Sequence, residues 1–355
     1  MIFLACAHLV YFTFLFRTIT SEMFESNKIS IENASLDSSP KIVWLMSFPN
    51  SGTSFTTDMI RRSTNQYTAT NYGEEHIDQE GFSVPLRKQD QMYEFGPFLS
   101  EKFTNQPEKR HLGKYVLTKT HCGGRCSRCA PLDYIESKDS FKTDCLTARR
   151  GFSDESGKLS FAKNQYDEKL VQKAIHLMRN PFNNIVSRFH LTHKVNARMI
   201  GDTNFQTSFP NDEQGFRKWC NVMDKKYAAD ESIMFKPSIV ELFEQVPCHA
   251  DFYRYVMWHN LAFETVDSLG IPSISVHYED YEHDFDGTKA EIITFLETEE
   301  VSSSSSDENE ALFVAGKSYG HFFTRDERNA IKNLIYELSS IETRNEVRRY
   351  FIDDY

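Results

Sequence analysis

The sequence has no excess of positive charge. Its 355 residues include 40 lysines and arginines against 51 aspartates and glutamates, so the formal net charge is −11. A protein that binds nucleic acid over a broad surface needs a basic face, and this balance therefore argues against a nucleic-acid partner. An anionic ligand would need a local cationic pocket within an acidic surrounding.

Long hydrophobic runs are also scarce. One apolar stretch covers residues 2–16, which is shorter than the ~20 residues of a membrane-spanning helix. We interpret residues 1–19 as a signal peptide or a signal anchor, with a buried core helix as the alternative. No basic residue precedes the stretch and no clear small-x-small cleavage site follows it, so the sequence leaves cleavage open. The chain would be attached to a membrane through residues 2–16 if uncleaved, and secreted if cleaved.

The usual phosphate-binding loop of nucleotide triphosphatases is missing as well. That loop reads G-x-x-x-x-G-K-[ST], and the one Gly-Lys-Ser of this chain, at 316–318, has Ala311 in place of the first glycine. No clear magnesium-binding aspartate follows a predicted strand. Both absences disfavour a phosphotransferase of the ordinary kind. The chain has no internal repeats either.

The polar residues 20–40 have the composition of a flexible stem between the N-terminal stretch and the first predicted strand. They contain one glycosylation sequon, Asn33-Ala34-Ser35, which is typical of a lumenal or secreted glycoprotein. The N-terminal stretch and the stem together predict entry into the secretory pathway.

Six cysteines remain when Cys6 of the hydrophobic stretch is set aside. An even number behind a targeting segment suggests up to three disulfides. The close spacing of the first three is also compatible with a zinc site. We favour disulfides, because the N-terminus implies an oxidising lumen, and we expect no metal. The six are Cys122, Cys126, Cys129, Cys145, Cys220 and Cys248.

Short apolar runs alternate with helical patterns along residues 41–355, which predicts a single α/β domain. Its sheet should be mostly parallel and covered by helices on both faces. We expect a loop-rich, Cys-rich insertion near 122–170 and a disordered, solvated loop near 302–310. The predicted strands are 42–46, 114–118, 173–178 and 272–276. The predicted helices begin at 55 and 181 or cover 250–268, 287–298 and 325–340. Ligands of such folds bind at the carboxyl ends of the strands.

The first predicted strand runs into a turn of small residues at 47–54, and a helical pattern follows. Such a loop directs backbone N–H groups and a helix N-terminus at a phosphate or sulfate. Gly52 would allow close approach of the ligand, and three hydroxyl side chains add donors. The alternative is an ordinary strand–turn–helix corner without a ligand. The candidate ligand-binding residues are Asn50, Ser51, Gly52, Thr53 and Ser54.

Three further segments at predicted strand ends or helix starts carry candidate chemistry. Lys119 and His121 follow the 114–118 strand, where a cation could stabilise an anionic group and an imidazole could take a proton from a hydroxyl. Arg179 precedes a helix that contains Ser187 about two turns on, which together suit a phosphate. Gly316 and Lys317 lie in a glycine-containing loop before the final helix. A buried histidine and a charged surface helix are the structural alternatives.

In this order and at these separations, the motifs resemble the sulfotransferases that use 3′-phosphoadenosine-5′-phosphosulfate. Residues 47–54 are similar to the family's 5′-phosphosulfate loop, and Arg179 with Ser187 to its 3′-phosphate site. Lys119-Thr120-His121 is similar to the Lys-x-His strand end of the cytosolic-type members. His277-Tyr278-Glu279-Asp280, with Trp258 in the preceding helix, also fits the C-terminal half. The resemblance covers residues 41–345 and implies the P-loop-like sulfotransferase fold.

The resemblance also implies a reaction. The cofactor's phosphates would bind at 47–54 and at Arg179 and Ser187, while the loop at Gly316 and Lys317 closes over the 3′-phosphate. His121 would deprotonate a hydroxyl acceptor, for which we expect a carbohydrate, and Lys119 would steady the transferring group. Lumenal members commonly use a glutamate base instead, and Glu75 lies where one would be expected. The location implied is the Golgi membrane, with the catalytic domain in the lumen.

One departure from the family concerns Asn50. The family usually has lysine or arginine at this position, and that cation assists the phosphate leaving group. Another cation could substitute, with Lys119, Arg61 and Lys317 as candidates. Otherwise the chain would be a catalytically impaired cofactor-binding protein of the same fold, which is the alternative function from another class.

Overall fold

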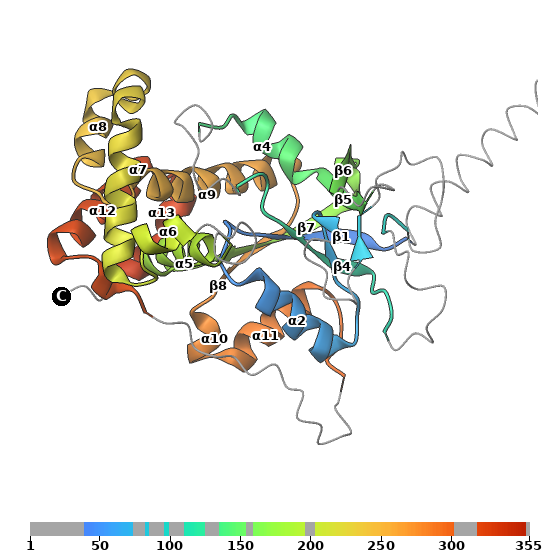
Figure 1. The fold of residues 1–355 in the computed structure, drawn as a ribbon. Helices are drawn as coiled ribbons and strands as arrows, with labels where there is room; N and C mark the ends of the chain where they lie inside the picture. The colour runs from blue at the N-terminus through green and yellow to red at the C-terminus, as the bar shows by residue number, and fades with distance from the viewer. Residues whose placement is uncertain are drawn as a thin grey trace, which may run out of the picture.

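A six-stranded parallel sheet forms the centre of the fold (Figure 1). The computed structural model describes residues 39–73, 82–84, 96–98, 110–124, 135–153, 159–195, 203–301 and 318–352. Every strand pairing in this sheet is parallel. The spatial order is β3 (Phe82–Ser83), β2 (Ala69–Thr70), β4 (Tyr115–Thr120), β1 (Lys41–Met46), β7 (Val171–Met178) and β8 (Ser273–His277). The predicted α/β class and parallel sheet are confirmed.

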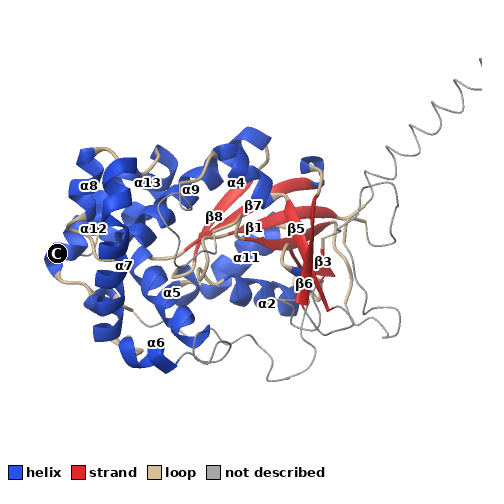
Figure 2. Cartoon of the chain, turned by 45° about the horizontal axis from the view of Figure 1, so that its top comes forward, coloured by secondary structure: helices blue, strands red, loops and turns tan. Residues whose placement is uncertain are grey.

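The central strand β1 explains why the sheet needs cover on both sides. Residues 42–46 are all 0% exposed, and side chains alternate between faces along a strand. Trp44 packs in a core with Phe252 and other apolar residues of α9 (His249–Leu269), whereas Leu45 packs with Met59 of α2 (Thr53–Thr64) on the opposite face. A strand buried on both faces is typical of parallel sheets. Figure 2 shows the strands between these two groups of helices.

The predicted helices are present with shifted ends. The structure has α2, α5 (Pro181–Val195), α9, α11 (Phe285–Phe295) and α12 (Arg325–Leu338). Gly270 ends α9 in the left-handed conformation, and Thr324 begins α12 with a capping box, as these residue types favour. Helices that the sequence pattern did not predict are α4 (Lys138–Cys145), α6 (Thr203–Ser208), α7 (Glu213–Met234), α8 (Pro237–Phe243), α10 (Asp280–His283) and α13 (Ile341–Val347), besides 3-10 turns at Glu168–Leu170, Gly320–Phe322 and Arg348–Phe351.

The expectation of a loop-rich insertion at 122–170 is wrong for its described residues. They form helix α4 and an antiparallel hairpin of β5 (Thr147–Ser153) and β6 (Leu159–Gln165). The hairpin lies outside the main sheet. Its strands carry charged residues such as Arg149 and Lys163, paired across the ladder. The period-two apolar signal that identifies a half-buried strand is therefore weak here.

The structure contains two disulfides among the described residues, which bears on the choice between disulfides and a zinc site. Cys122 pairs with Cys145, and Cys220 pairs with Cys248. Cys122 is thus not a zinc ligand, and no group of three or more metal-binding side chains occurs in the described ranges. Cys126 and Cys129 lie outside the described residues. Both disulfides are compatible with a secreted or lumenal protein.

The described part of the chain contains no helix that is both long and apolar enough to span a membrane. The predicted signal segment 1–19, nearly all of the predicted stem and the predicted loop 302–310 lie outside the described residues.

Candidate active site

The described candidate residues, apart from Ser187, lie at the carboxyl edge of the sheet. Strand β1 lies between β4 and β7, so the loop after β1 is flanked by the ends of both neighbours. Met46, the last residue of β1, is in register with Thr120 of β4 and His176 of β7. From β1 the chain passes through α2 to β2, on the β4 side. Crevices between neighbouring loops at such an edge are where ligands of α/β sheets bind.

The loop at 47–52 turns sharply in front of α2. Asn50 and Gly52 both have left-handed backbones, with φ of 69° and 100°. A Cβ on Gly52 would lie 2.1 Å from Cδ2 of Tyr278, the residue that follows β8. Gly52 accepts the first helical hydrogen bond of α2, from the N–H of Thr56 at 3.1 Å. The predicted glycine requirement thus has two causes, the backbone angle and the close ring.

The N-terminus of α2 suits an anion. It has no side-chain cap and no acidic residue in its first turn. By contrast, α5 begins at the same edge, and its first N–H groups are capped by Asn180, whose Oδ1 accepts from Phe182 and Asn183. The first N–H groups of a helix have no partner within the helix and carry its positive dipole end. Thr53 is buried and Ser54 exposed at this terminus.

Ser51 is engaged inside the loop. Its hydroxyl donates to the carbonyl of Phe48 at 2.7 Å and accepts from Asn184 Nδ2 at 3.0 Å. The same Asn184 amide donates to the carbonyl of Pro49 at 3.1 Å. Ser51 is 0% exposed. The side chain of Ser51 therefore shapes the loop, and any bond from Ser51 to an anion would come from its backbone N–H.

Asn184 was not predicted as a site residue. It lies on α5 and is 0% exposed, among buried apolar neighbours such as Ile185 and Val186. An asparagine on the buried stripe of an amphipathic helix requires polar partners, and that polarity was the available signal. Its partners, the carbonyl of Pro49 and the hydroxyl of Ser51, belong to the loop itself.

Arg179 also reaches the loop. Its Nη1 donates to the carbonyl of Asn50 at 2.7 Å, and its guanidinium lies 4.9 Å from the centre of the Tyr278 ring. The backbone carbonyl of Arg179 accepts from the hydroxyl of Tyr255 at 2.7 Å. Guanidinium has five donors, so one bond to Asn50 leaves others for a ligand. A cation thus stands beside the position where the loop itself has none.

Ser187 is farther along α5, half-buried, and none of the contacts found among the described residues links it to the loop. Arg188, next to Ser187, has its guanidinium 4.5 Å from the ring centre of Phe48 and an ion pair with Asp251 at 3.4 Å. Glu279 accepts the N–H of Asn180 at 3.0 Å, and burial raises the pKa of its carboxyl. The edge therefore brings together two arginines and a carboxyl group whose charge is disfavoured by burial.

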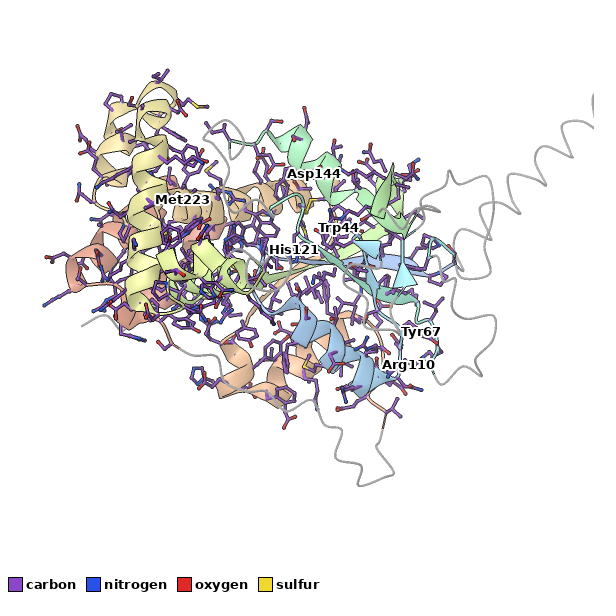
Figure 3. The ribbon with its side chains drawn as sticks, viewed as in Figure 1. Trp44, Tyr67, Arg110, His121, Asp144 and Met223 are labelled. Atoms are coloured by element: carbon purple, nitrogen blue, oxygen red, sulfur yellow. A yellow bond between two sulfur atoms is a disulfide. The ribbon has the colours of Figure 1, made fainter. Side chains whose placement is uncertain are left out.

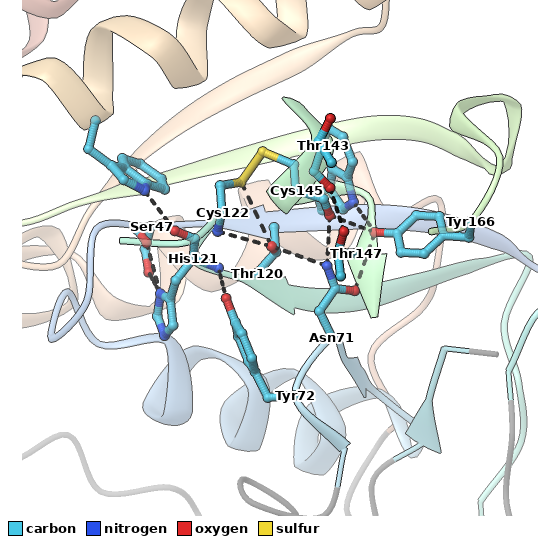
Figure 4. The surroundings of a disulfide bond; sticks show 12 residues. Ser47, Asn71, Tyr72, Thr120, His121, Cys122, Thr143, Cys145, Thr147 and Tyr166 are labelled. Carbon is cyan, nitrogen blue, oxygen red and sulfur yellow. Dashed lines mark hydrogen bonds between the residues drawn. A yellow bond between two sulfur atoms is a disulfide. The ribbon is translucent and has the colours of Figure 1, made fainter. Parts of the chain in front are cut away.

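His121 lies near the centre of the fold (Figure 3) and is hydrogen-bonded directly to the loop (Figure 4). Its Nδ1 lies 2.8 Å from the carbonyl oxygen of Ser47 and 3.1 Å from Ser47 Oγ. A carbonyl can only accept, so in the neutral ring Nδ1 carries the proton and Nε2 carries the lone pair. His121 is only 5% exposed. The tautomer held by Ser47 is the one in which Nε2 can act as a base.

Lys119 lies within β4, because the strand continues past the predicted end to Thr120. It is two residues from Leu117, which packs in the core shared with α2, so both side chains are on the α2 face of the sheet. Lys119 is 8% exposed. The cation and the loop's helix therefore share one face.

Three predicted site residues, Glu75, Gly316 and Lys317, lie outside the described residues. The chain just after the last two packs on α5, where the N–H of Tyr319 donates to Asn183 Oδ1 at 2.8 Å. Arg61, one substitute considered for the missing loop cation, lies in the last turn of α2 and pairs with Asp58 at 2.5 Å. It is therefore at the opposite end of the helix from the loop.

No protein-family model matches this chain, and no curated protein matches it.

Proposed function

We propose that this protein is a sulfotransferase that moves a sulfonate group from 3′-phosphoadenosine-5′-phosphosulfate to a hydroxyl of an acceptor, which we expect to be a carbohydrate. The observation that carries this proposal is the hydrogen bond between His121 and Ser47. It joins a candidate base to the first residue of an anion-binding loop. A base and an anion cradle in contact are what the transfer of an anionic group to a hydroxyl requires.

In this proposal the loop and the α2 N-terminus hold the phosphosulfate, through backbone N–H groups of residues 50–54. Nε2 of His121 takes the acceptor's hydroxyl proton. The acceptor oxygen then bonds to sulfur as the bond between sulfur and the phosphate oxygen breaks, and 3′-phosphoadenosine 5′-phosphate leaves. Lys119 offsets the charge of the transferring group. Glu75 is the alternative base, and no metal is required.

The remaining proposed contacts concern the nucleotide. Arg179 and Ser187 would hold the 3′-phosphate, with Gly316 and Lys317 closing over it. Arg179 also donates to the carbonyl of Asn50, so we propose that its charge partly replaces the missing loop cation. We further propose that the domain works in the Golgi lumen, attached through residues 2–16 unless that segment is removed.

A second function has one observation in its favour. Asn50 is uncharged, so even with Arg179 nearby the leaving group would have weaker assistance than in the family that the chain resembles. A catalytically impaired protein that binds the nucleotide without transferring sulfonate would have the same cradle. A P-loop phosphotransferase is the weaker alternative, since the chain lacks the Gly-Lys-[ST] loop.

The deciding experiment combines binding and transfer. The lumenal domain would be titrated with 3′-phosphoadenosine 5′-phosphate and then assayed with sulfur-labelled cofactor against a panel of glycans and phenols. Absence of nucleotide binding would overturn both the sulfotransferase and the impaired-protein proposals. Binding without transfer to any acceptor favours the impaired protein. His121→Ala and Glu75→Ala, assayed in parallel, identify the base by which of them abolishes transfer.

A further inference from the structure

The residue that follows His121 is one half of a disulfide. Cys122 is bonded to Cys145, and both are 0% exposed. Cys122 also has a left-handed backbone, with φ of 44°, which a non-glycine residue adopts only when its surroundings enforce it. The residue directly after the candidate base is thus both disulfide-bonded and held in an unfavourable backbone conformation.

The other half of the disulfide is fixed to the sheet (Figure 4). Cys145 is the last residue of α4. Its carbonyl accepts from Asn71 Nδ2 at 2.7 Å and from the hydroxyl of Tyr166 at 3.0 Å. The hydroxyl of Tyr166 in turn accepts from Nε1 of Trp44, in β1, at 2.7 Å. Buried bonds of this kind hold Cys145 against the same strand that leads into the anion-binding loop.

His121 itself is held on several sides. Its backbone N–H donates to the hydroxyl of Tyr72, and its ring stacks on that of Tyr72 with centroids 5.5 Å apart. Its carbonyl accepts from Nε1 of Trp258 at 2.7 Å and from the N–H of Gly124 at 3.0 Å. Phe141 of α4 packs edge-on against Trp258, with centroids 5.6 Å apart. Helix α4 therefore supports His121 both through the disulfide and through this tryptophan.

Beyond Ser47, which is bonded to His121, the anion-binding loop has separate supports. Asn184 and Arg179 hold it from α5 and from the end of β7, and neither contacts the disulfide through any hydrogen bond found in the described ranges. Loss of the disulfide would therefore disturb His121 and leave the nucleotide cradle in place. A mutation can therefore change the position of His121 without changing the affinity for the nucleotide.

We propose that the Cys122–Cys145 disulfide is a positioning element for His121, which keeps Nδ1–H on the carbonyl of Ser47 and Nε2 as the basic nitrogen. The inference rests on the proposed function where it concerns turnover. Its structural part, the tautomer and orientation of the His121 ring, stands independently of any reaction.

The chain provides a matched control in its second disulfide. Cys220–Cys248 has a sequence separation of 28, against 23 for Cys122–Cys145, so the two close loops of similar length and constrain the unfolded chain similarly. Cys220–Cys248 links α7 to the residue before α9. Loss of the Cys220–Cys248 disulfide should lower the free energy of unfolding without changing the position of His121.

The experiment compares Cys122→Ala/Cys145→Ala with Cys220→Ala/Cys248→Ala, each in the otherwise unchanged chain. We expect the first pair to lower kcat about tenfold or more, as misplaced general bases do, with nucleotide Kd within about twofold. We expect the control pair to keep kcat within about twofold. If the first pair does not fold, Cys122→Gly/Cys145→Ala replaces it, because glycine accepts the φ of residue 122 without strain.

A second readout does not depend on turnover. Nitrogen NMR of the histidine-labelled protein reports the His121 tautomer: protonated at Nδ1 in the wild type and the control pair, and a mixture in Cys122→Ala/Cys145→Ala. An unchanged tautomer together with unchanged kcat would overturn the inference, as would equal kcat losses in both pairs. If the wild type transfers no sulfonate but the tautomer shifts as expected, only the proposed function fails.

Discussion

The ring of Tyr278 lies directly over Gly52, where a Cβ would lie 2.1 Å from Cδ2 and 2.4 Å from Cε2. Gly52 also has a φ of 100°, a region that residues with a side chain rarely adopt. The loop at 47–52 and the end of β8 are thus in contact at a position that only glycine fits. The guanidinium of Arg179 packs on the same tyrosine ring, so a disturbance at Gly52 is passed to the nearest loop cation.

Gly52→Ala should therefore weaken binding of 3′-phosphoadenosine 5′-phosphate by more than about tenfold, because the new methyl group must displace either the ring or the loop. Gly270→Ala is the matched control, since Gly270 has a φ of 63° and nothing within 4 Å of its Cβ position. The control should lose about 1 kcal/mol of stability and keep its affinity. Calorimetric titration measures the two affinities, and denaturant unfolding measures the stability of the control. Equal affinities in the two variants would contradict the proposed cradle.

Asn184 should matter for the loop more than for the fold. Asn184→Ala removes the donors to Pro49 O and Ser51 Oγ, and unsatisfied buried acceptors cost about 1–3 kcal/mol. We expect nucleotide affinity to fall about tenfold. Asn260→Ala is the control, because the side chain of Asn260 likewise holds two hydrogen-bond partners, Leu338 O and Ser340 N, in a different part of the molecule. Denaturant unfolding should show comparable losses of stability for both variants, with an affinity loss in Asn184→Ala alone.

Asn50→Lys tests why the loop has no cation of its own. A lysine there would add positive charge beside the proposed position of the leaving phosphate, and we expect kcat to rise about tenfold. Asn65→Lys is the control: Asn65 ends α2 with a left-handed φ of 52°, against 69° for Asn50, so both variants have the backbone cost of replacing asparagine in that region. Rapid-quench transfer assays would compare them. An unchanged kcat in Asn50→Lys would show that the missing charge does not limit the reaction.

The strands and the loop were predictable because β1 and β7 are short apolar runs that end in turn residues, a local pattern. The contact between His121 and Ser47 could not be predicted, because it depends on the register that pairs Met46 with Thr120. Nothing in either strand's own sequence specifies that pairing. Helix α7 was missed although Phe216, Trp219 and Tyr227 are buried along it at helical spacing, because charged residues interrupt the stripe. The choice of partner for Cys122 likewise depends on where α4 packs.

A buried histidine pair should make the fold sensitive to acid. His176 in β7 and His259 in α9 share a 2.8 Å hydrogen bond between their rings, and both are nearly inaccessible to water. Burial lowers the pKa of His176 to about 3, and burial together with His176 and His277 lowers the pKa of His259 well below 6.5. The folded protein therefore keeps both rings uncharged under conditions in which the unfolded chain takes up protons.

These two histidines should therefore make the free energy of unfolding decrease as the pH falls. As pH falls below about 6.5, the unfolded chain binds protons that the folded one does not, and each such histidine removes up to about 1.4 kcal/mol of stability per pH unit. Burial raises the pKa of Glu136 to about 7 and that of Asp224 to about 6, so those carboxyls act in the opposite direction over the same range. A variant without the histidines is needed to isolate the effect.

We expect His176→Phe/His259→Phe to be less sensitive to acid than the wild type, because apolar rings replace both partners of the bond and leave neither unsatisfied. Urea unfolding at pH 7, 6 and 5 would measure the free energy of unfolding, and the difference between the two proteins should change by at least about 1 kcal/mol per unit. Proton NMR of the wild type provides a check without mutation: the ring signals of His176 and His259 should not titrate between pH 7.5 and 5. Titration of either ring in that range would contradict the prediction.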